Sequence, residues 1–226
     1  MGRSSDAQGR IVRAAARLFL ARSYHGVGVD ELCAAADVRK GSFYYYFPAK
    51  AELAKAVIDL HAQAFWAQLD DNEQATPVER LHAVADAIGE IQMGLESQFG
   101  RAVGCPFGNL AAELATSDED VRAHVAAVLA ELERRLALVF REASEQGLLR
   151  AGVDPERLAH ALLAQYQGMI LLAKVNASSA AELPPALHEL IDANLSDPVR
   201  SRSADAVKPA ASRSSGSAAA VATPSG

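Results

Sequence analysis

Apolar residues recur every three or four positions along most of the chain, and this spacing constrains the fold more than any other feature of the sequence. Between residues 121 and 140, for example, Val121, Val125, Leu132, Leu136 and Phe140 fall on one face of a helix. The alternation of apolar and polar residues that is typical of half-buried strands is scarce. The sequence therefore predicts an all-α fold.

Residue types that favour helix ends divide this pattern into separate helices. Thr76, Pro77 and Glu79 match a capped helix start, and Asp154-Pro155-Glu156 opens another helix. Pro48 ends a short helix, because the residue before a proline is steered out of the helical region. We expect helices at about residues 10–23, 29–36, 40–46, 49–70, 76–98, 106–115, 118–146, 154–175 and 185–195.

The predicted helices form a small head and a larger body. We expect a flexible N-terminus at residues 1–7, a head of three short helices at 8–55 and a helical body at 56–195. Residues 196–226 are rich in Ser, Ala, Pro and Gly and hold few large apolar side chains. Such a segment cannot bury enough surface to offset its loss of conformational entropy, so we predict a disordered tail.

Charge is distributed unevenly between the head and the rest of the chain. Residues 1–55 carry nine Lys or Arg against five Asp or Glu, a net charge of +4, whereas the remainder carries 13 against 23, a net charge of −10. A basic head on an acidic body is the pattern expected when only the head meets a polyanion.

Several classes of protein are disfavoured by the sequence. No apolar run approaches the roughly 18–20 residues of a membrane span, and MGRSSDAQGR lacks the apolar segment of a secretory signal. Cys33 and Cys105 lie far apart, and the six histidines show no i, i+4 pair. We therefore expect a cytoplasmic protein that uses no metal, no cofactor and no membrane.

The segment VRKGSFYYYFPAK at residues 38–50 holds five consecutive aromatic residues beside three cations, in a chain that is only 6% aromatic. It follows a helix and a tight turn at Asp37-Val38, which is the order of a helix-turn-helix, whose second helix enters the major groove of DNA. Phe43 and Phe47 share a face and should pack inside the head. Arg39, Lys40, Gly41, Ser42, Tyr44, Tyr45, Tyr46 and Lys50 then remain as candidates for contact with phosphates or bases. An aromatic patch that binds another protein is the alternative.

The longer segment VDELCAAADVRKGSFYYYFPAKAEL resembles the DNA-binding signature of the tetracycline-repressor (TetR) family of bacterial regulators. The resemblance covers about residues 8–58 and places the helix-turn-helix at about 28–47. It implies DNA contacts from Lys40, Gly41, Ser42, Tyr44, Tyr46 and Lys50, with Arg39 and Tyr45 as additions. The sequence departs from the family pattern at Val27-Gly28, at Asp37 and at Arg39, which affects the operator contacts rather than the class.

The resemblance also implies a homodimer, built through two long helices at residues 118–146 and 154–175. The second of these is apolar almost all round, as expected of a helix that is buried on two sides, although an internal core helix is the alternative. A two-fold dimer would place two heads on a pseudo-palindromic operator. Residues 56–195 would then be a regulatory and dimerisation domain with a cavity for an effector. Its candidate lining residues are Phe65, Trp66, Leu69, Met93, Phe99, Cys105, Phe107, Asn109, Tyr166, Met169 and Lys174.

Cys105 precedes Pro106 and so should lie at a helix N-terminus, where the helix field favours a thiolate. The segment GCPFGNLAAEL resembles a form found in the electrophile-responsive branch of the family, whose fold brings Lys174 towards this region. Cys105 is then a candidate sensor of oxidants or electrophiles. A small buried apolar residue is the alternative for Cys105, and packing is the expected role of Cys33.

These features predict a DNA-binding transcriptional regulator, a repressor that a small molecule or modification of Cys105 releases from its operator. It would be cytoplasmic, and on the bacterial nucleoid when bound to DNA. Two alternatives stay open: a helical protein–protein interaction module, and a helical enzyme with a pocket near Trp66 and Tyr166. No catalytic triad order, nucleotide-binding loop or paired-carboxylate motif stands out, so we predict that the chain is not an enzyme.

Overall fold

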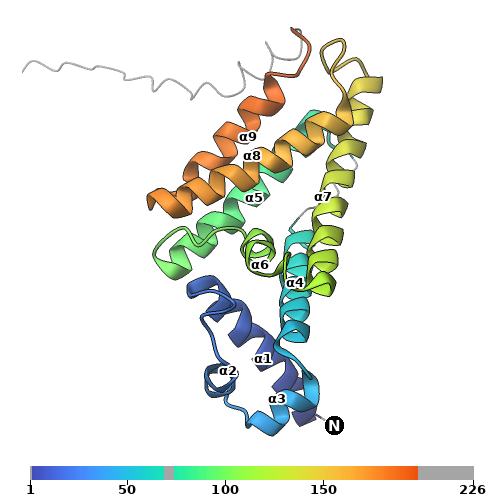
Figure 1. The fold of residues 1–226 in the computed structure, drawn as a ribbon. Coiled ribbons are helices and arrows are strands. Elements are labelled where there is room, and N and C mark those ends of the chain that lie inside the picture. Colours follow the sequence, from blue (N-terminus) through green and yellow to red (C-terminus); the bar gives the residue numbers. More distant parts are fainter. Residues whose placement is uncertain (1, 69–73, 198–226) are drawn as a thin grey trace, which may run out of the picture.

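The computed structural model describes residues 2–68 and 74–197, and every regular element in these two ranges is a helix (Figure 1). The all-α prediction is confirmed. Residues 69–73 and 198–226, which include Leu69 and nearly all of the predicted tail, lie outside the described residues. Within the described part, no helix is long and apolar enough to cross a membrane.

Three helices form the head: α1 (Gly2–Ala21), α2 (Val29–Ala36) and α3 (Lys40–Tyr46). Helix α1 begins at Gly2, so it includes residues 2–7, which the sequence analysis expected to be flexible. An i, i+4 ion pair between Asp6 and Arg10, at 3.8 Å, favours this extension. Helix α2 ends at Asp37, whose φ of 50° lies in the left-handed region that the tight turn requires and that Asp tolerates.

The body contains six α-helices and one short 3₁₀ helix in the described residues. These are α4 (Lys50–Trp66), α5 (Pro77–Phe99), α6 (Pro106–Leu114), α7 (Glu119–Glu145), α8 (Pro155–Asn176), η1 (Ala180–Glu182) and α9 (Leu183–Asp192). Helix α5 starts with a complete capping box, in which Thr76 accepts from the Glu79 N–H and Glu79 accepts from the Thr76 N–H. The side chains of Asp118 and Asp154 cap α7 and α8 by accepting from backbone N–H groups of the first turn, without a reciprocal bond.

The boundaries of α9 and α4 also differ from those predicted from the sequence. The final helix spans Leu183–Asp192 rather than 185–195, because Pro184 and Pro185 lie in its first turn, where a missing N–H costs nothing. After Asp192 the chain instead pairs with the loop before α8, through a bridge between Leu149 and Leu195 and a 2.8 Å bond from the Ser196 N–H to the Leu148 carbonyl. Helix α4 ends at Trp66 rather than near residue 70.

Helix α6 lies between the head and the rest of the body (Figure 1). It packs against α4 and α7, while α7 and α8 run along each other and α9 covers α5 and α8. The buried apolar side chains form one continuous core from Ile11 in the head to Leu195 at the end of the described chain. The head and the body are therefore joined through packed side chains as well as through the chain itself.

Candidate nucleic-acid interface and effector cavity

Helix α3 presents a mixed aromatic and cationic surface to solvent. Phe43 and Phe47 are buried beneath it, as predicted. Tyr45 is 77% exposed and Tyr44 is also exposed, whereas Tyr46 and Ser42 are half-buried. Arg39 and Lys40 are exposed at the N-terminal end of the helix. A Cβ added at Gly41 would meet nothing within 4 Å, so another backbone can approach this end closely.

Two cations of the head are paired with exposed carboxylates. The Lys40 ammonium lies 2.8 Å from Asp30 on α2, and this hydrogen bond raises the pKa of Lys40. The carboxylate of Asp37 is fully exposed and lies 3.9 Å from the Arg10 guanidinium. Both pairs are at the surface, so a phosphate can compete for either cation at little cost.

Lys50 is engaged inside the head rather than presented beside α3. Its ammonium donates to the carbonyl of Tyr24 and lies 4.0 Å from the centre of the Tyr24 ring. Burial lowers the pKa of Lys50, against a smaller opposing influence from Glu113. The role of Lys50 in DNA contact, which was carried over from the family pattern, stays a prediction.

Glu113, in the last turn of α6, connects the body to the loop between α1 and α2. Its carboxylate accepts hydrogen bonds from the backbone N–H groups of Tyr24 and His25, each at 2.9 Å, and lies 3.1 Å from Nδ1 of His25. Burial alone would raise the pKa of Glu113, but the bonds to His25 and Tyr24 together outweigh it, and the pKa is lowered. The Arg101 guanidinium also donates to the carbonyl of Ala21 at 2.9 Å, which adds another link between the body and the head.

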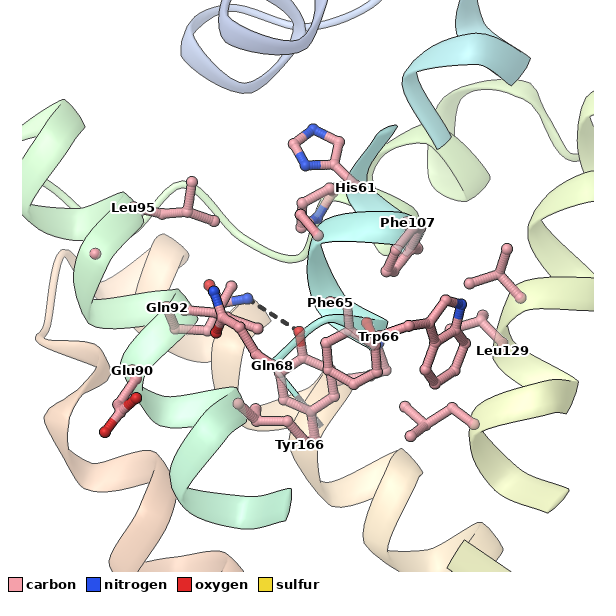
Figure 2. Close-up of a pocket in the computed structure, with 18 residues that line it drawn as sticks. His61, Phe65, Trp66, Gln68, Glu90, Gln92, Leu95, Phe107, Leu129 and Tyr166 are labelled. Atoms are coloured by element: carbon pink, nitrogen blue, oxygen red, sulfur yellow. Dashed lines mark hydrogen bonds between the residues drawn. The ribbon is translucent and has the colours of Figure 1, made fainter. Parts of the chain in front are cut away.

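A cavity of about 290 Å³ lies in the body between α4, α5, α6, α7 and α8 (Figure 2). Apolar and aromatic side chains form most of its wall. They include Phe65, Trp66, Ile88, Ile91, Leu95, Phe107, Val128, Leu129 and Leu132. This composition, with a few polar groups among the apolar ones, is typical of a small-molecule site.

The polar groups of the cavity come from three helices. Gln92 on α5, which is only 2% exposed, donates from Nε2 to the Tyr166 hydroxyl on α8 at 2.9 Å. Burial, with the neighbouring Cys105, raises the pKa of Tyr166 well above its usual range. His61 on α4 lies at the head-facing end of the cavity (Figure 2). Its Nε2 is enclosed and has no hydrogen-bond partner, and burial lowers the pKa of His61 to about 4.

Of the predicted lining residues, the structure places Phe65, Trp66, Phe107 and Tyr166 at the cavity. The predicted residues that it places elsewhere are Met93, Phe99, Cys105, Asn109, Met169 and Lys174. Met93 is exposed on α5, and Asn109 lines a small void between α6 and the head. His61, Gln92 and Gln167 also line the cavity, and they are absent from the set predicted from the sequence. A glutamine within the apolar face of α5 was the available signal for Gln92.

Cys105 lies one residue outside this wall, as the N-cap of α6. Its side chain is buried, and its sulfur accepts from Nε2 of Gln167 at 3.4 Å. Lys174 approaches the neighbouring Gly104, but its ammonium donates to Oδ1 of Asn109 at 2.9 Å. Cys33 is buried in the head core, as expected of a packing residue.

Five of the six histidines lie within 3.2 Å of a carboxylate, and His61 is the exception. His82 and His188 also stack on each other, with ring centres 4.4 Å apart. Among the described residues, no group of three or more His, Cys, Asp or Glu side chains is arranged to hold a metal ion.

Two family models match the chain. Residues 11–57 match the model described as bacterial regulatory proteins, tetR family, and residues 77–183 match the tetracyclin repressor-like C-terminal domain. The first match contains the whole helix-turn-helix, and the second contains the cavity walls contributed by α5 to α8.

Characterised proteins and solved structures agree with these matches. The transcriptional regulator AcuR of Cereibacter sphaeroides is 37% identical over 76% of this chain and 78% of its own length. The repressor NemR of Escherichia coli is 27% identical over 76% of this chain and 86% of its own length. A crystal structure of regulatory protein TetR from Rhodobacter sphaeroides superposes with a TM-score of 0.72, at 31% identity, over 84% of this chain and 99% of that one. The reduced form of E. coli NemR superposes with a TM-score of 0.70, at 25% identity, over 84% and 97%.

Proposed function

Since the chain belongs to the TetR family of bacterial DNA-binding transcriptional regulators, we propose that it is a repressor that binds a pseudo-palindromic operator as a homodimer. A small molecule in the body cavity, or modification of Cys105, releases it from that operator. The observation that carries the proposal is the exposed, cationic and tyrosine-rich α3, held by a buried Phe43 and Phe47 at the position of a recognition helix.

The surface of α3 supports contact with duplex DNA. Arg39, Lys40 and Gly41 surround the N-terminal end of the helix, which is the end that faces base edges in a helix-turn-helix. Tyr44 and Tyr45 extend outward from the next turn and offer hydroxyl groups to phosphates. Because these contacts are largely electrostatic, the affinity depends steeply on salt, which a protein-binding aromatic patch would not require.

An apolar stripe on α8 supports the homodimer. Leu171, Leu172 and Val175 are all exposed on this helix, and Val175 is 71% exposed. Ala161, Ala164 and Gly168 continue the same face at alternating three- and four-residue steps, which allows a second helix to approach closely. On α7 only Leu138 is exposed among the large apolar side chains. The interface therefore centres on α8, with α7 contributing less than the family pattern implied.

The position of α6 supports a mechanism in which changes in the body cause the head to release DNA. The first residues of α6, Pro106 and Phe107, line the cavity, and Cys105 is the N-cap of this helix. Glu113, in the last turn of α6, binds the α1–α2 loop. A group added to the buried Cys105 sulfur has to displace neighbours in this packed core, and a ligand in the cavity contacts the first turn of α6 directly. Any shift of α6 then moves Glu113 and with it the head. The inducer must bind the non-binding state more tightly for this shift to occur.

Two measurements test the proposal on an operator taken from an inverted repeat beside the gene. Fluorescence anisotropy with labelled duplex should show tight, palindrome-dependent binding by the full chain. The double variant Lys40→Ala with Tyr44→Ala should lose this binding while its circular dichroism stays helical. If the double variant binds the palindrome as well as the parent does, the DNA-reading role of α3 is wrong.

Release through Cys105 is tested with iodoacetamide. The thiolate displaces iodide, so that a sulfur–carbon bond forms and the carbon–iodine bond breaks. Iodoacetamide should release operator from the parent but not from Cys105→Ser, whereas Cys33→Ser should behave as the parent. If Cys105→Ser is released equally, modification of this residue is not the trigger.

A further inference from the structure

We propose that the body cavity selects an uncharged, largely apolar effector and discriminates against carboxylates of the same shape. This inference rests on the proposed function, in which occupation of the cavity weakens operator binding. It concerns the charge of the ligand, which none of the related proteins' names specifies.

The described residues that line the cavity include no Lys or Arg. Glu90 is the one lining residue among them with a formal charge, and its exposed side chain points away from the central lining residues Gln92 and Tyr166 (Figure 2). The polar groups further in are neutral amides, from Gln92 and Gln167, and the phenol of Tyr166. Burial keeps the phenol protonated, because it disfavours the charged form. His61 is neutral at pH 7 for the same reason.

Two cations that contact residues in or next to the cavity wall, Arg135 and Lys174, are already paired. The Arg135 guanidinium stacks 4.6 Å from the centre of the Trp66 ring and donates to Glu131 at 2.8 Å. The Lys174 ammonium donates to Oδ1 of Asn109 at 2.9 Å. Neither side chain lines the cavity, so neither can neutralise an anion without first leaving its partner.

A buried carboxylate without a counter-charge loses its hydration and gains little in return, at a cost of several kcal/mol. A neutral amide, ketone or ester loses far less. It can also bond to Nε2 of His61, which is enclosed and lacks a partner, and which donates or accepts according to its tautomer. We therefore expect the neutral member of an isosteric pair to bind at least about tenfold more tightly, which corresponds to about 1.4 kcal/mol.

The size of the cavity limits the ligand to a single ring or a short chain. A volume of about 290 Å³ holds about ten groups of the size of a water molecule. The aromatic side chains of Phe65, Trp66 and Phe107 form one end of it, where a flat apolar group can pack. Phenylacetamide and hexanamide fit these limits, and phenylacetate and hexanoate are their isosteric anions.

Trp66 makes occupancy directly measurable, because it is the only tryptophan in the chain and lies in the cavity wall. The four probes are titrated into the full-length protein at pH 7 while the tryptophan fluorescence is recorded. The proposal expects each amide to change the fluorescence at a concentration at least about tenfold lower than its carboxylate. Equal or tighter binding of the carboxylates overturns the proposal, and so does the absence of any response to the amides at millimolar concentration.

A matched pair of variants tests whether the lining charge is the cause. Gln68 lines the cavity from the turn that follows α4, whereas Gln63 in the last turn of α4 is exposed and lies outside the cavity wall. Gln68→Arg should lower the ratio of the carboxylate and amide dissociation constants by about threefold or more, whereas Gln63→Arg should leave this ratio unchanged. If both variants keep the parent's preference, the lining charge does not set selectivity and the proposal is overturned.

Operator binding is measured separately by anisotropy, so the two ideas fail in different ways. If the amides occupy the cavity preferentially but leave the operator bound, the selectivity stands and the proposed mode of release is wrong. If a carboxylate occupies the cavity as tightly as its amide and releases the operator, the mode of release stands and the selectivity is wrong.

Discussion

The Glu113 carboxylate accepts the backbone N–H of Tyr24 at 2.9 Å, across 89 positions of sequence, and the same carboxylate accepts the N–H of His25. These bonds join the last turn of α6, whose N-cap is Cys105, to the α1–α2 loop. That loop leads into the helix-turn-helix. The Tyr24 carbonyl meanwhile accepts from Lys50 at the start of α4. Tyr24 therefore binds to both α6 and α4, and these two helices together hold the α1–α2 loop in place.

Replacing Glu113 with glutamine should weaken this junction. The side-chain amide of the introduced glutamine presents an N–H to one of the two backbone donors, so at least one charge-assisted bond is lost. We expect the free energy of unfolding to fall by about 1–2 kcal/mol, as measured by urea denaturation. Glu119→Gln is the control, because Glu119 is an exposed carboxylate that pairs only with Arg122 at the start of α7. Equal stability of the two variants would show that the Glu113 bonds contribute nothing.

The salt dependence of operator binding should change when Lys40 is replaced. If Lys40 leaves Asp30 to contact a phosphate, Lys40→Ala removes one released counterion per head. The slope of log affinity against log salt should then become less steep by about two in a dimer. Arg157→Ala is the control, because it removes an exposed cation at the start of α8 in the body. A slope that is the same in both variants would exclude a phosphate contact by Lys40.

Charge placed on the apolar stripe of α8 should separate the dimer. Leu172→Glu would bury a carboxylate in the interface without a partner, so we expect a monomer by light scattering at micromolar concentration. Val175→Glu, one helical turn further, should act in the same direction. Leu138→Glu places the same charge on α7 and should disturb the dimer less. A dimer that survives both α8 changes would move the interface away from this helix.

Local signals in the sequence predicted the local features of the fold. Thr76, Pro77 and Glu79 predicted a capped helix start, and both bonds of the capping box are present. The tight turn expected at Asp37-Val38 is present, with a φ of 50° at Asp37. Phe43 and Phe47 are buried because their four-residue spacing places both on the inner face of α3. Each of these depends on residues within one or two helical turns.

The features that sequence reasoning missed depend on contacts between distant segments. In the sequence, Glu113 is an acidic residue on a short helix with no special signal. Its role follows only from the contact between α6 and the α1–α2 loop. The bond from the Lys50 ammonium to the Tyr24 carbonyl, which links residues 26 positions apart, has no local signal in the sequence either. Four of the eleven predicted wall residues line the cavity: Phe65, Trp66, Phe107 and Tyr166. Those that the structure places elsewhere show that periodicity alone cannot tell a core side chain from one that faces a void.

His61 illustrates the same limit and gives a pH dependence. It is enclosed between the cavity and a small void lined by Ala16, Phe19 and Leu110, and these neighbours offer no charge to an imidazolium. Burial therefore lowers its pKa from 6.5 to about 4. Between these two values the unfolded chain binds a proton at His61 that the folded chain does not, so stability falls as the pH is lowered.

Replacing His61 with leucine should remove this contribution. At pH 5 the unfolded imidazole is mostly protonated while the folded one stays neutral, which costs the parent about 2 kcal/mol relative to pH 7. Urea denaturation should show that the free energy of unfolding falls between pH 7 and pH 5 by about 2 kcal/mol less in His61→Leu than in the parent. His160→Leu is the control, because His160 is exposed and lies 3.2 Å from Glu133, so its replacement should not reduce the loss. If the loss on acidification is as large in His61→Leu as in the parent, the imidazole is not held neutral by burial.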